Sequence, residues 1–268
     1  LLLAEEASPR FVYDLETVSA RIDEMNSLGT DRVFFAIKAN PHPAILGLIE
    51  QKGLGFECVS PQEIAHVRQV FPNLDANRIL FTPNFAPQEE YQQGFEQAGY
   101  VTLDALFPLR EWPETFANRD VIVRIDTGKG KGHHKYVVTA GTQSKFGVPP
   151  QDLDELLVLA KQHNLRIIGL HAHAGSGILD PSNWAEKAQY LQDLCHRFSS
   201  VRLLNLGGGF GVPQKPDDAR LEMAKVKQSL AAFRAEYPEI ELWVEPGRYL
   251  VAEAGVLLTK VTQLKSKG

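Results

Sequence analysis

The residues best suited to do chemistry in this sequence follow apolar, strand-like runs, and the first of them is Lys38. It comes directly after Val33-Phe-Phe-Ala-Ile37 and just before Pro41 and Pro43, which interrupt regular structure. An ammonium group is rarely buried without a partner, so Lys38 either extends its charged end into water or takes part in a reaction. In an apolar pocket its pKa would be depressed, and the free amine would suit Schiff-base chemistry with a carbonyl compound. Position alone leaves both interpretations open.

A glycine-rich stretch, Leu206-Gly-Gly-Gly-Phe-Gly211, offers a binding site for an anion. Successive glycines let backbone N–H groups approach a phosphate, although a tight turn explains such a run equally well. The turn Gly175-Ser176-Gly177 and the guanidinium of Arg248 follow neighbouring strand-like runs. In a parallel barrel these three groups would adjoin one another, which favours a phosphate site over a simple turn.

His171, His173 and Glu245 indicate what else such a site could hold. The two histidines are two residues apart on a strand-like run, so their side chains point the same way. They could bind a metal ion, which requires a further ligand, or an imidazole could pack flat on an aromatic ligand. Glu245 could form an internal salt bridge with Arg248, or it could keep a pyridine nitrogen protonated. A Schiff-base lysine, a phosphate site, an imidazole platform and this carboxylate together match pyridoxal phosphate.

Eight strand-like runs alternate with amphipathic segments and would position these groups. The runs are residues 33–38, 56–60, 79–82, 100–104, 121–126, 166–173, 203–209 and 241–247. Helical spacing is found in residues 15–28, 43–52, 61–70, 87–98, 150–163, 183–198 and 220–237, whereas residues 105–110 allow only a short helix. This alternation predicts an α/β fold, a (β/α)8 TIM barrel whose active site forms at the C-terminal ends of the strands.

At that end of the barrel the strand-like runs would bring many polar groups together. These are Lys38, Glu57, Ser60, Asn84, Asp104, Arg124, Asp126, His171, His173, Gly207, Gly208, Gly209, Glu245 and Arg248. The long connection from residue 127 to residue 147 contains Gly128-Lys-Gly-Lys-Gly-His-His134, which lacks the residue order of a P-loop. We expect this connection to be a lid or an interface segment.

Composition limits the class of partner. The chain of 268 residues has a formal net charge of −5, whereas a nucleic-acid or membrane surface calls for clustered basic charge. No apolar run reaches the roughly 18 residues of a membrane span, and Cys58 and Cys195 show neither metal-binding nor paired spacing. We therefore expect a cytoplasmic protein with a small polar ligand and with no nucleic-acid or membrane partner.

Five motifs, in this order, resemble those of the fold-type III pyridoxal-phosphate-dependent decarboxylases, the group of ornithine, arginine and diaminopimelate decarboxylases. They are Ala36-Ile-Lys-Ala-Asn40, Gly55-Phe-Glu-Cys-Val-Ser60, His171-Ala-His-Ala-Gly-Ser176, Gly207-Gly-Gly209 and Glu245-Pro-Gly-Arg248. The sequence most resembles diaminopimelate decarboxylases, and Phe81-Thr-Pro-Asn-Phe-Ala-Pro87 and Gly130-Lys-Gly-His-His134 are similar to the form fused to an aspartate kinase. The resemblance implies decarboxylation of meso-2,6-diaminopimelate to L-lysine, with release of CO2, in lysine biosynthesis.

The resemblance also implies a role for each matching residue. Lys38, His173 and Glu57 would be catalytic: Lys38 would bind pyridoxal 5'-phosphate as a Schiff base, His173 would stack on the cofactor ring, and Glu57 would be an acid near the lysine. Glu245 would lie at the pyridinium nitrogen. The phosphate would be held by Ser176, Gly207, Gly208, Gly209 and Arg248, and Gly247 would also bind the cofactor. Arg248 would also lie near the amino-acid substrate, and no metal is implied.

Residues 15–248 would form the cofactor-binding barrel, and residues 11–14 and 249–268 would be strands of a second β domain that is largely absent. In the family that domain supplies an acid, which is a cysteine from the partner subunit, and a tyrosine at the phosphate. A homodimer with shared active sites is therefore implied, and residues 1–268 alone should bind the cofactor poorly and be inactive.

Four alternative functions remain open from the sequence. They are a decarboxylase of arginine, ornithine or a carboxyspermidine-type substrate, an amino-acid racemase, a non-catalytic pyridoxal-phosphate-binding homologue, and an unrelated barrel that acts on sugar phosphates. A racemase of this type is expected to place an arginine at the ring nitrogen, where this chain has Glu245.

Overall fold

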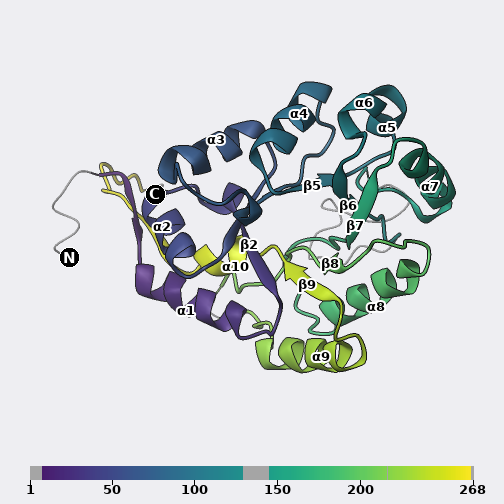
Figure 1. Cartoon of the computed structure of the whole chain (residues 1–268). Coiled ribbons are helices and arrows are strands. Elements are labelled where there is room, and N and C mark those ends of the chain that lie inside the picture. The colour runs from purple at the N-terminus through teal and green to yellow at the C-terminus, as the bar shows by residue number, and fades with distance from the viewer. Residues whose placement is uncertain (1–7, 129–144, 216, 267–268) are drawn as a thin grey trace.

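Eight parallel strands close into a barrel surrounded by helices (Figure 1). The computed structural model describes residues 8–128, 145–215 and 217–266. In barrel order the strands are β2 (Arg32–Ala36), β3 (Gly55–Cys58), β4 (Ile79–Phe81), β5 (Tyr100–Leu103), β6 (Asp120–Arg124), β7 (Arg166–His171), β8 (Leu203–Asn205) and β9 (Glu241–Val244). Each of the eight predicted runs overlaps one of these strands, so the predicted (β/α)8 barrel is confirmed. The motif at residues 130–134 lies outside the described residues.

The strands form because apolar residues line both of their faces, as is usual in a parallel sheet covered by helices. Side chains alternate along each strand, so that Phe34 of β2 points into the barrel and Phe35 packs under the surrounding helices. The barrel interior is filled by Phe34, Leu80, Ile122, Ile168, Leu203 and Trp243, all nearly inaccessible to solvent. This apolar layer closes the barrel below the polar groups at the strand ends.

The helices mostly occupy the predicted segments. They are α1 (Leu15–Asn26), α2 (Pro43–Gln51), α3 (Pro61–Val70), α4 (Gln88–Gln97), α7 (Leu153–Gln162), α8 (Asn183–Cys195) and α9 (Met223–Glu236). Residues 105–110 were predicted to allow only a short helix. This part of the chain contains two short helices, α5 (Phe107–Glu111) and α6 (Pro113–Phe116). Pro113 begins α6, because proline fits the first turn of a helix but not its interior. Among the described residues, no helix is both long and apolar enough to cross a membrane.

The predicted strands extend too far at their C-terminal ends. Lys38 lies in the 3-10 turn η2 (Ile37–Ala39) rather than in β2, and β8 and β9 end before the glycines that follow them. Gly207 and Gly209 have positive φ values of 62° and 89°, which are incompatible with a β-strand. The chemistry-bearing residues therefore lie on turns just beyond the strands.

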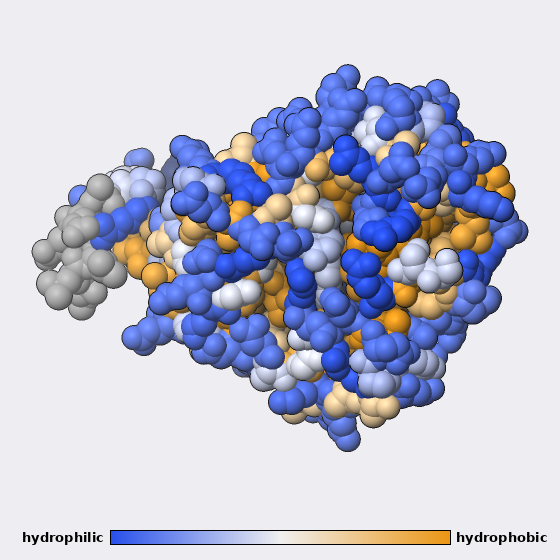
Figure 2. Space-filling view, in the orientation of Figure 1, coloured by the Kyte–Doolittle hydropathy of each residue, from blue (hydrophilic) through white to orange (hydrophobic). Residues whose placement is uncertain are grey.

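A separate two-stranded antiparallel sheet lies beside the barrel, close to both ends of the described chain (Figure 1). It pairs β1 (Arg10–Tyr13) with β10 (Gly255–Leu258), with Phe11 opposite Leu257. The strand expected from residue 249 starts later than predicted, because residues 248–251 form the short helix α10 (Arg248–Val251). Phe11 and Leu257 are 68% and 55% exposed, whereas hydrophilic residues cover most of the face of the molecule seen in Figure 2. An apolar patch thus lies on this small sheet.

Candidate active site

A cavity of about 580 Å³ opens at the C-terminal ends of the barrel strands, where the sequence predicts the active site. Of the ten predicted site residues, nine line it: Lys38, Glu57, His173, Ser176, Gly208, Gly209, Glu245, Gly247 and Arg248. Gly207 instead packs behind the wall, where a Cβ atom would lie 2.9 Å from the carbonyl oxygen of Ala172. The cavity has room for a small ligand such as a cofactor.

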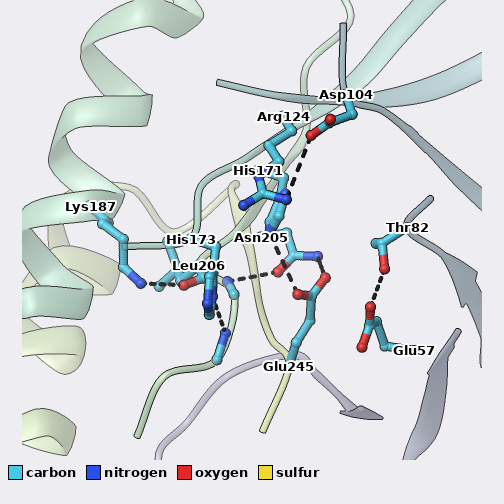
Figure 3. A network of polar contacts seen from close by, with 12 residues as sticks. Glu57, Thr82, Asp104, Arg124, His171, His173, Lys187, Asn205, Leu206 and Glu245 are labelled. Carbon is cyan, nitrogen blue, oxygen red and sulfur yellow. Dashed lines mark hydrogen bonds and ion pairs between the residues drawn. The ribbon is translucent and has the colours of Figure 1, made fainter. Parts of the chain in front are cut away.

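The floor of this cavity belongs to a layer of polar side chains, one from the C-terminal end of each of seven neighbouring strands (Figure 3), of which all but Asp104 and Asn205 line the cavity. In barrel order they are Glu57, Thr82, Asp104, Arg124, His171, Asn205 and Glu245. All seven are at most 9% exposed. Because buried charges are costly unless they are paired, the interactions among these groups determine which charges persist.

Lys38 and Glu57 form an ion pair at one side of the cavity. Lys38 Nζ lies 2.7 Å and 3.0 Å from the two carboxylate oxygens of Glu57, which also accepts a hydrogen bond from the Thr82 hydroxyl. Burial alone would lower the pKa of Lys38, but the carboxylate of Glu57 outweighs it and leaves the pKa raised above its ordinary value. The expectation of a depressed pKa for Lys38 is therefore wrong. The Lys38 side chain is 53% exposed, so a ligand in the cavity can reach it.

Replacing Glu57 with glutamine should lower the pKa of Lys38, because the amide keeps the shape of the side chain but removes its negative charge. We expect Lys38 of the variant to react with an aldehyde at lower pH than in the parent. The rate of borohydride-trapped modification of Lys38, measured against pH, checks this. Lys52, which pairs with Asp23 on the surface, is the internal control whose profile should not change. An unchanged or higher midpoint for Lys38 would contradict this role of Glu57.

Glu245 is held as an anion at the end of β9, the strand that pairs with β2. Its Oε1 accepts a hydrogen bond of 2.7 Å from Asn205 Nδ2, and its Oε2 lies 3.5 Å from His171 Nε2. Burial would raise the pKa of Glu245, but His171, Lys38 and Asn205 together lower it to about 2. The alternative of a salt bridge to Arg248 is wrong, because Arg248 is exposed and Glu245 is bonded elsewhere. A buried carboxylate that remains charged near neutral pH can hold a proton on a ligand nitrogen.

His173 and the glycine loop, residues 207–209, form one wall of the cavity. The backbone N–H of Gly208 donates to His173 Nδ1 over 3.3 Å. Nδ1 is therefore the acceptor nitrogen, and burial keeps the imidazole neutral by lowering the pKa of His173. A Cβ atom on Gly208 would lie 2.3 Å from the carbonyl oxygen of Glu245, so only glycine allows the loops after β8 and β9 to pack this closely.

Helix α8 supports the glycine loop from behind. Trp184 Nε1 donates a hydrogen bond of 3.2 Å to the carbonyl oxygen of Gly208, and buried Lys187 donates to that of Leu206. The Trp184 indole also stacks on Phe210, with ring centroids 4.2 Å apart. These contacts fix two carbonyl oxygens away from the cavity, as the approach of an anion to the loop requires.

The glycine loop and the turns next to it fit a phosphate group. Ser176, Gly177, Gly208, Gly209, Gly247 and Arg248 line it. Glycine N–H groups, a hydroxyl and a guanidinium are the donors that proteins use for phosphate, and Arg248 forms no ion pair with any described residue. In the same cavity, Glu245 and Lys38 supply an acceptor for a ring N–H and an amine for an aldehyde. The donor set is that of a pyridoxal phosphate site.

Other polar residues predicted at the strand ends have structural roles. Ser60 caps α3: its hydroxyl accepts from the backbone N–H of Glu63, and the Glu63 carboxylate accepts from that of Val59. Asp126 accepts from the backbone N–H of Gly128 and is not among the residues that line the cavity. Within the described ranges, no three His, Cys, Asp or Glu side chains are grouped as a metal site would require.

Arg124 links the polar layer to the loop that follows. Its guanidinium donates to Asn84 Oδ1 over 2.9 Å, lies 3.6 Å from Asp104 Oδ1 and stacks over the Phe146 ring at 4.5 Å. Burial lowers the pKa of Arg124 and raises that of Asp104. Two members of the polar layer, Thr82 and Asn205, were absent from the predicted set. Each is a polar residue at a strand end, and this was the only signal that could have identified them.

Comparison with known proteins agrees with this geometry. Residues 15–252 match the family described as pyridoxal-dependent decarboxylase, pyridoxal binding domain. Diaminopimelate decarboxylase from Methanothermobacter thermautotrophicus is 31% identical over 87% of this chain, and the chain spans 57% of the length of that relative. The crystal structure of diaminopimelate decarboxylase from M. jannaschii in complex with L-lysine is 25% identical with a TM-score of 0.86, covering 99% of this chain and 67% of the other.

A third comparison shows the breadth of the fold. Lysine decarboxylase from Selenomonas ruminantium superposes with a TM-score of 0.87 at 24% identity, over 100% of this chain and 70% of the other, which indicates a shared fold. The family match covers most of the barrel and includes every predicted site residue. The alternative of an unrelated barrel that acts on sugar phosphates is thereby excluded. The chain belongs to the family of pyridoxal-dependent decarboxylases and contains its pyridoxal-binding domain.

Proposed function

We propose that the full-length protein containing this domain decarboxylates meso-2,6-diaminopimelate to L-lysine with release of CO2, using pyridoxal 5'-phosphate. The single observation that carries the reaction type is Glu245, a carboxylate buried at the cavity floor and kept anionic by Asn205 and His171. A charged acceptor here favours a protonated pyridine nitrogen, which makes the ring a stronger electron sink. A strong electron sink favours decarboxylation over racemisation. The diaminopimelate decarboxylases among the relatives support the substrate.

When bound, the cofactor supplies an electron sink for the electron pair left behind as the α-carboxylate departs as CO2. We propose that Lys38 provides the amine for the aldehyde carbon and that Glu57, 2.7 Å from Nζ, receives the ammonium proton. Glu245 would hold the proton on the ring nitrogen, and His173 would contact the ring face. Ser176, the glycines 207–209, Gly247 and Arg248 would bind the phosphate, and Arg248 would also lie near the substrate.

A decarboxylase of another basic amino acid is the second candidate. The fold also occurs in a lysine decarboxylase, and the described cavity has no residue that we can assign to the distal end of the substrate. Release of CO2 from meso-diaminopimelate, lysine, arginine and ornithine by the full-length protein with added pyridoxal phosphate separates these candidates. Release from meso-diaminopimelate alone supports the proposal, whereas preference for another amino acid contradicts the proposed substrate.

We also propose that β1 and β10 belong to a second β domain that completes the site in a homodimer. The 68%-exposed Phe11 and 55%-exposed Leu257 form an apolar surface that further strands could cover. We further propose that the enzyme is cytoplasmic and acts on a small molecule, and its formal net charge of −5 agrees with a small polar substrate. The motif at residues 81–87 supports a form related to the fusion with an aspartate kinase.

Residues 1–268 expressed alone should therefore bind pyridoxal phosphate weakly and release no CO2, because groups from the second domain would be missing. The measurement compares residues 1–268 with the full-length protein, using cofactor binding and CO2 release from meso-diaminopimelate, and light scattering gives the oligomeric state of each. Full activity of residues 1–268 as a monomer would contradict the proposed second domain and the shared site.

A further inference from the structure

Asn205, the last residue of β8, connects the Glu245 carboxylate to the glycine loop, residues 207–209, through one side chain. It is 0% exposed, and its amide makes two hydrogen bonds (Figure 3). Nδ2 donates to Glu245 Oε1 over 2.7 Å, and Oδ1 accepts from the backbone N–H of Gly207 over 3.0 Å. We propose that Asn205 is a positioning residue that couples the carboxylate at the cofactor's ring nitrogen to the glycine loop at its phosphate. This inference rests on the proposed function.

The chemistry of the amide fits this role better than that of any residue of similar size. Asparagine carries a donor and an acceptor on one planar group, whereas aspartate only accepts when ionised and leucine does neither. The orientation of the Asn205 amide is also determined by its neighbours. A flipped amide would place its NH2 group against the Gly207 N–H and its oxygen against the Glu245 carboxylate, and both contacts would be repulsive.

On the phosphate side, Asn205 fixes the start of the glycine loop. Gly207 has a φ of 62°, and the hydrogen bond to Asn205 satisfies its N–H group in this left-handed conformation. A Cβ atom on Gly207 would lie 2.9 Å from His173 Nδ1, and the next N–H, that of Gly208, donates to the same nitrogen. A displacement of Gly207 would therefore move both the glycine loop and the His173 ring.

On the ring side, Asn205 provides a neutral donor within a charged environment. The groups that act electrostatically on Glu245 come from three other elements: His171 and His173 from β7 and the turn that follows it, Lys38 from η2, and Arg124 from β6. The 2.7 Å hydrogen bond from Asn205 is shorter than the 3.5 Å contact with His171. Asn205 therefore orients the carboxylate without competing with it for a proton.

Two substitutions separate the two hydrogen bonds. Asn205→Ala removes both, while Asn205→Asp keeps the acceptor for Gly207 and replaces the donor with a second carboxylate. Thr102→Val is the matched control, because Thr102 on the barrel strand β5 is 1% exposed and its hydroxyl has no hydrogen-bond partner among the described residues. Thermal unfolding of the full-length variants shows whether each one folds.

The experiment measures two quantities for the full-length protein and each variant. The first is the ratio of the dissociation constants of pyridoxal and pyridoxal phosphate, which reports the contribution of the phosphate. The second is the pH of the acid-side transition in the absorption spectrum of the bound cofactor, which reports the state of Glu245. A merely structural role for Asn205 would change the unfolding temperature and leave both quantities as they are in Thr102→Val.

We expect Asn205→Ala to lower the ratio roughly tenfold, since a hydrogen bond that orders the loop is lost. Its spectral transition should move to higher pH by about one unit, because the Glu245 anion loses a donor. Asn205→Asp should keep a ratio close to that of the parent and still shift the transition to higher pH, because two carboxylates then face each other.

Three results would overturn the inference. If Asn205→Ala folds and matches the parent in both quantities, Asn205 positions neither group. If Asn205→Asp lowers the ratio as strongly as Asn205→Ala, the hydrogen bond to Gly207 is not the coupling element. Failure of the parent itself to bind pyridoxal phosphate would contradict the proposed function as well, so the two kinds of failure are distinguishable.

Discussion

Replacement of Lys38 by alanine should reduce CO2 release by a factor on the order of 10²–10⁴, the contribution typical of a positioned acid–base group. Lys38 is the lysine whose amine faces the cavity, within 2.7 Å of the Glu57 carboxylate. Without that amine the cofactor has no covalent attachment, and the proton that Glu57 would receive is absent. We expect cofactor binding to weaken and the activity to fall together.

Borohydride reduction followed by peptide mapping checks this prediction independently of turnover. The parent should carry a reduced cofactor on the peptide that contains Lys38, and the variant should carry none. Lys52→Ala is the matched control, because Lys52 forms an ion pair with Asp23 outside the cavity and should have no effect. A Lys38→Ala protein that retains both the trapped cofactor and the activity would show that another amine serves the reaction.

Replacement of Glu245 by glutamine should lower kcat by a factor on the order of 10²–10³, comparable to the loss of one preorganised electrostatic group. Glutamine keeps the size of the side chain and can still accept the hydrogen bond from Asn205. It lacks the negative charge that favours a proton on the ring nitrogen, so the electron sink weakens. KM should change little, because the substitution removes a charge that would act on the ring nitrogen of the cofactor and removes no proposed substrate contact.

Steady-state kinetics with pH as the variable tests the assignment of Glu245. In the parent the pKa of Glu245 is lowered to about 2, so the anion persists well below its ordinary titration range. Loss of activity as the pH falls from 7 to 5 should therefore come from other groups, and the parent and the Glu245→Gln variant should lose activity in parallel over that range. A variant with full kcat would remove the basis for preferring decarboxylation to racemisation.

The strands of the barrel could be predicted from the sequence because their signal is local. Runs such as Val33-Phe-Phe-Ala-Ile37 are apolar on both faces and rich in β-branched and aromatic residues, which is typical of a buried parallel strand. Their ends were harder to place, because an apolar or glycine residue after a strand continues the pattern while its backbone turns away. Gly207 and Gly209 show this. Their positive φ values are incompatible with a strand, and β8 ends before them, at Asn205.

The identity of most site residues was also predictable, because each lies at a strand end or in a family motif. Their electrostatic states were not. The pKa of Lys38 is raised by Glu57, which is 19 residues away in sequence and adjacent only because β2 and β3 pair. The hydrogen bonds of Asn205 could not be predicted for the same reason, because its partners Glu245 and Gly207 lie on two different loops. Tertiary contacts, rather than local patterns, determine these properties.

The most direct test of the proposed function is CO2 release from meso-2,6-diaminopimelate by the full-length protein with added pyridoxal phosphate, with L-lysine measured as the product. We predict equal amounts of CO2 and L-lysine from the parent, and a loss of both from Lys38→Ala by a factor on the order of 10²–10⁴. A protein that binds pyridoxal phosphate through Lys38 but releases no CO2 from this substrate would contradict the proposed reaction, and release from arginine, ornithine or lysine instead would contradict the proposed substrate.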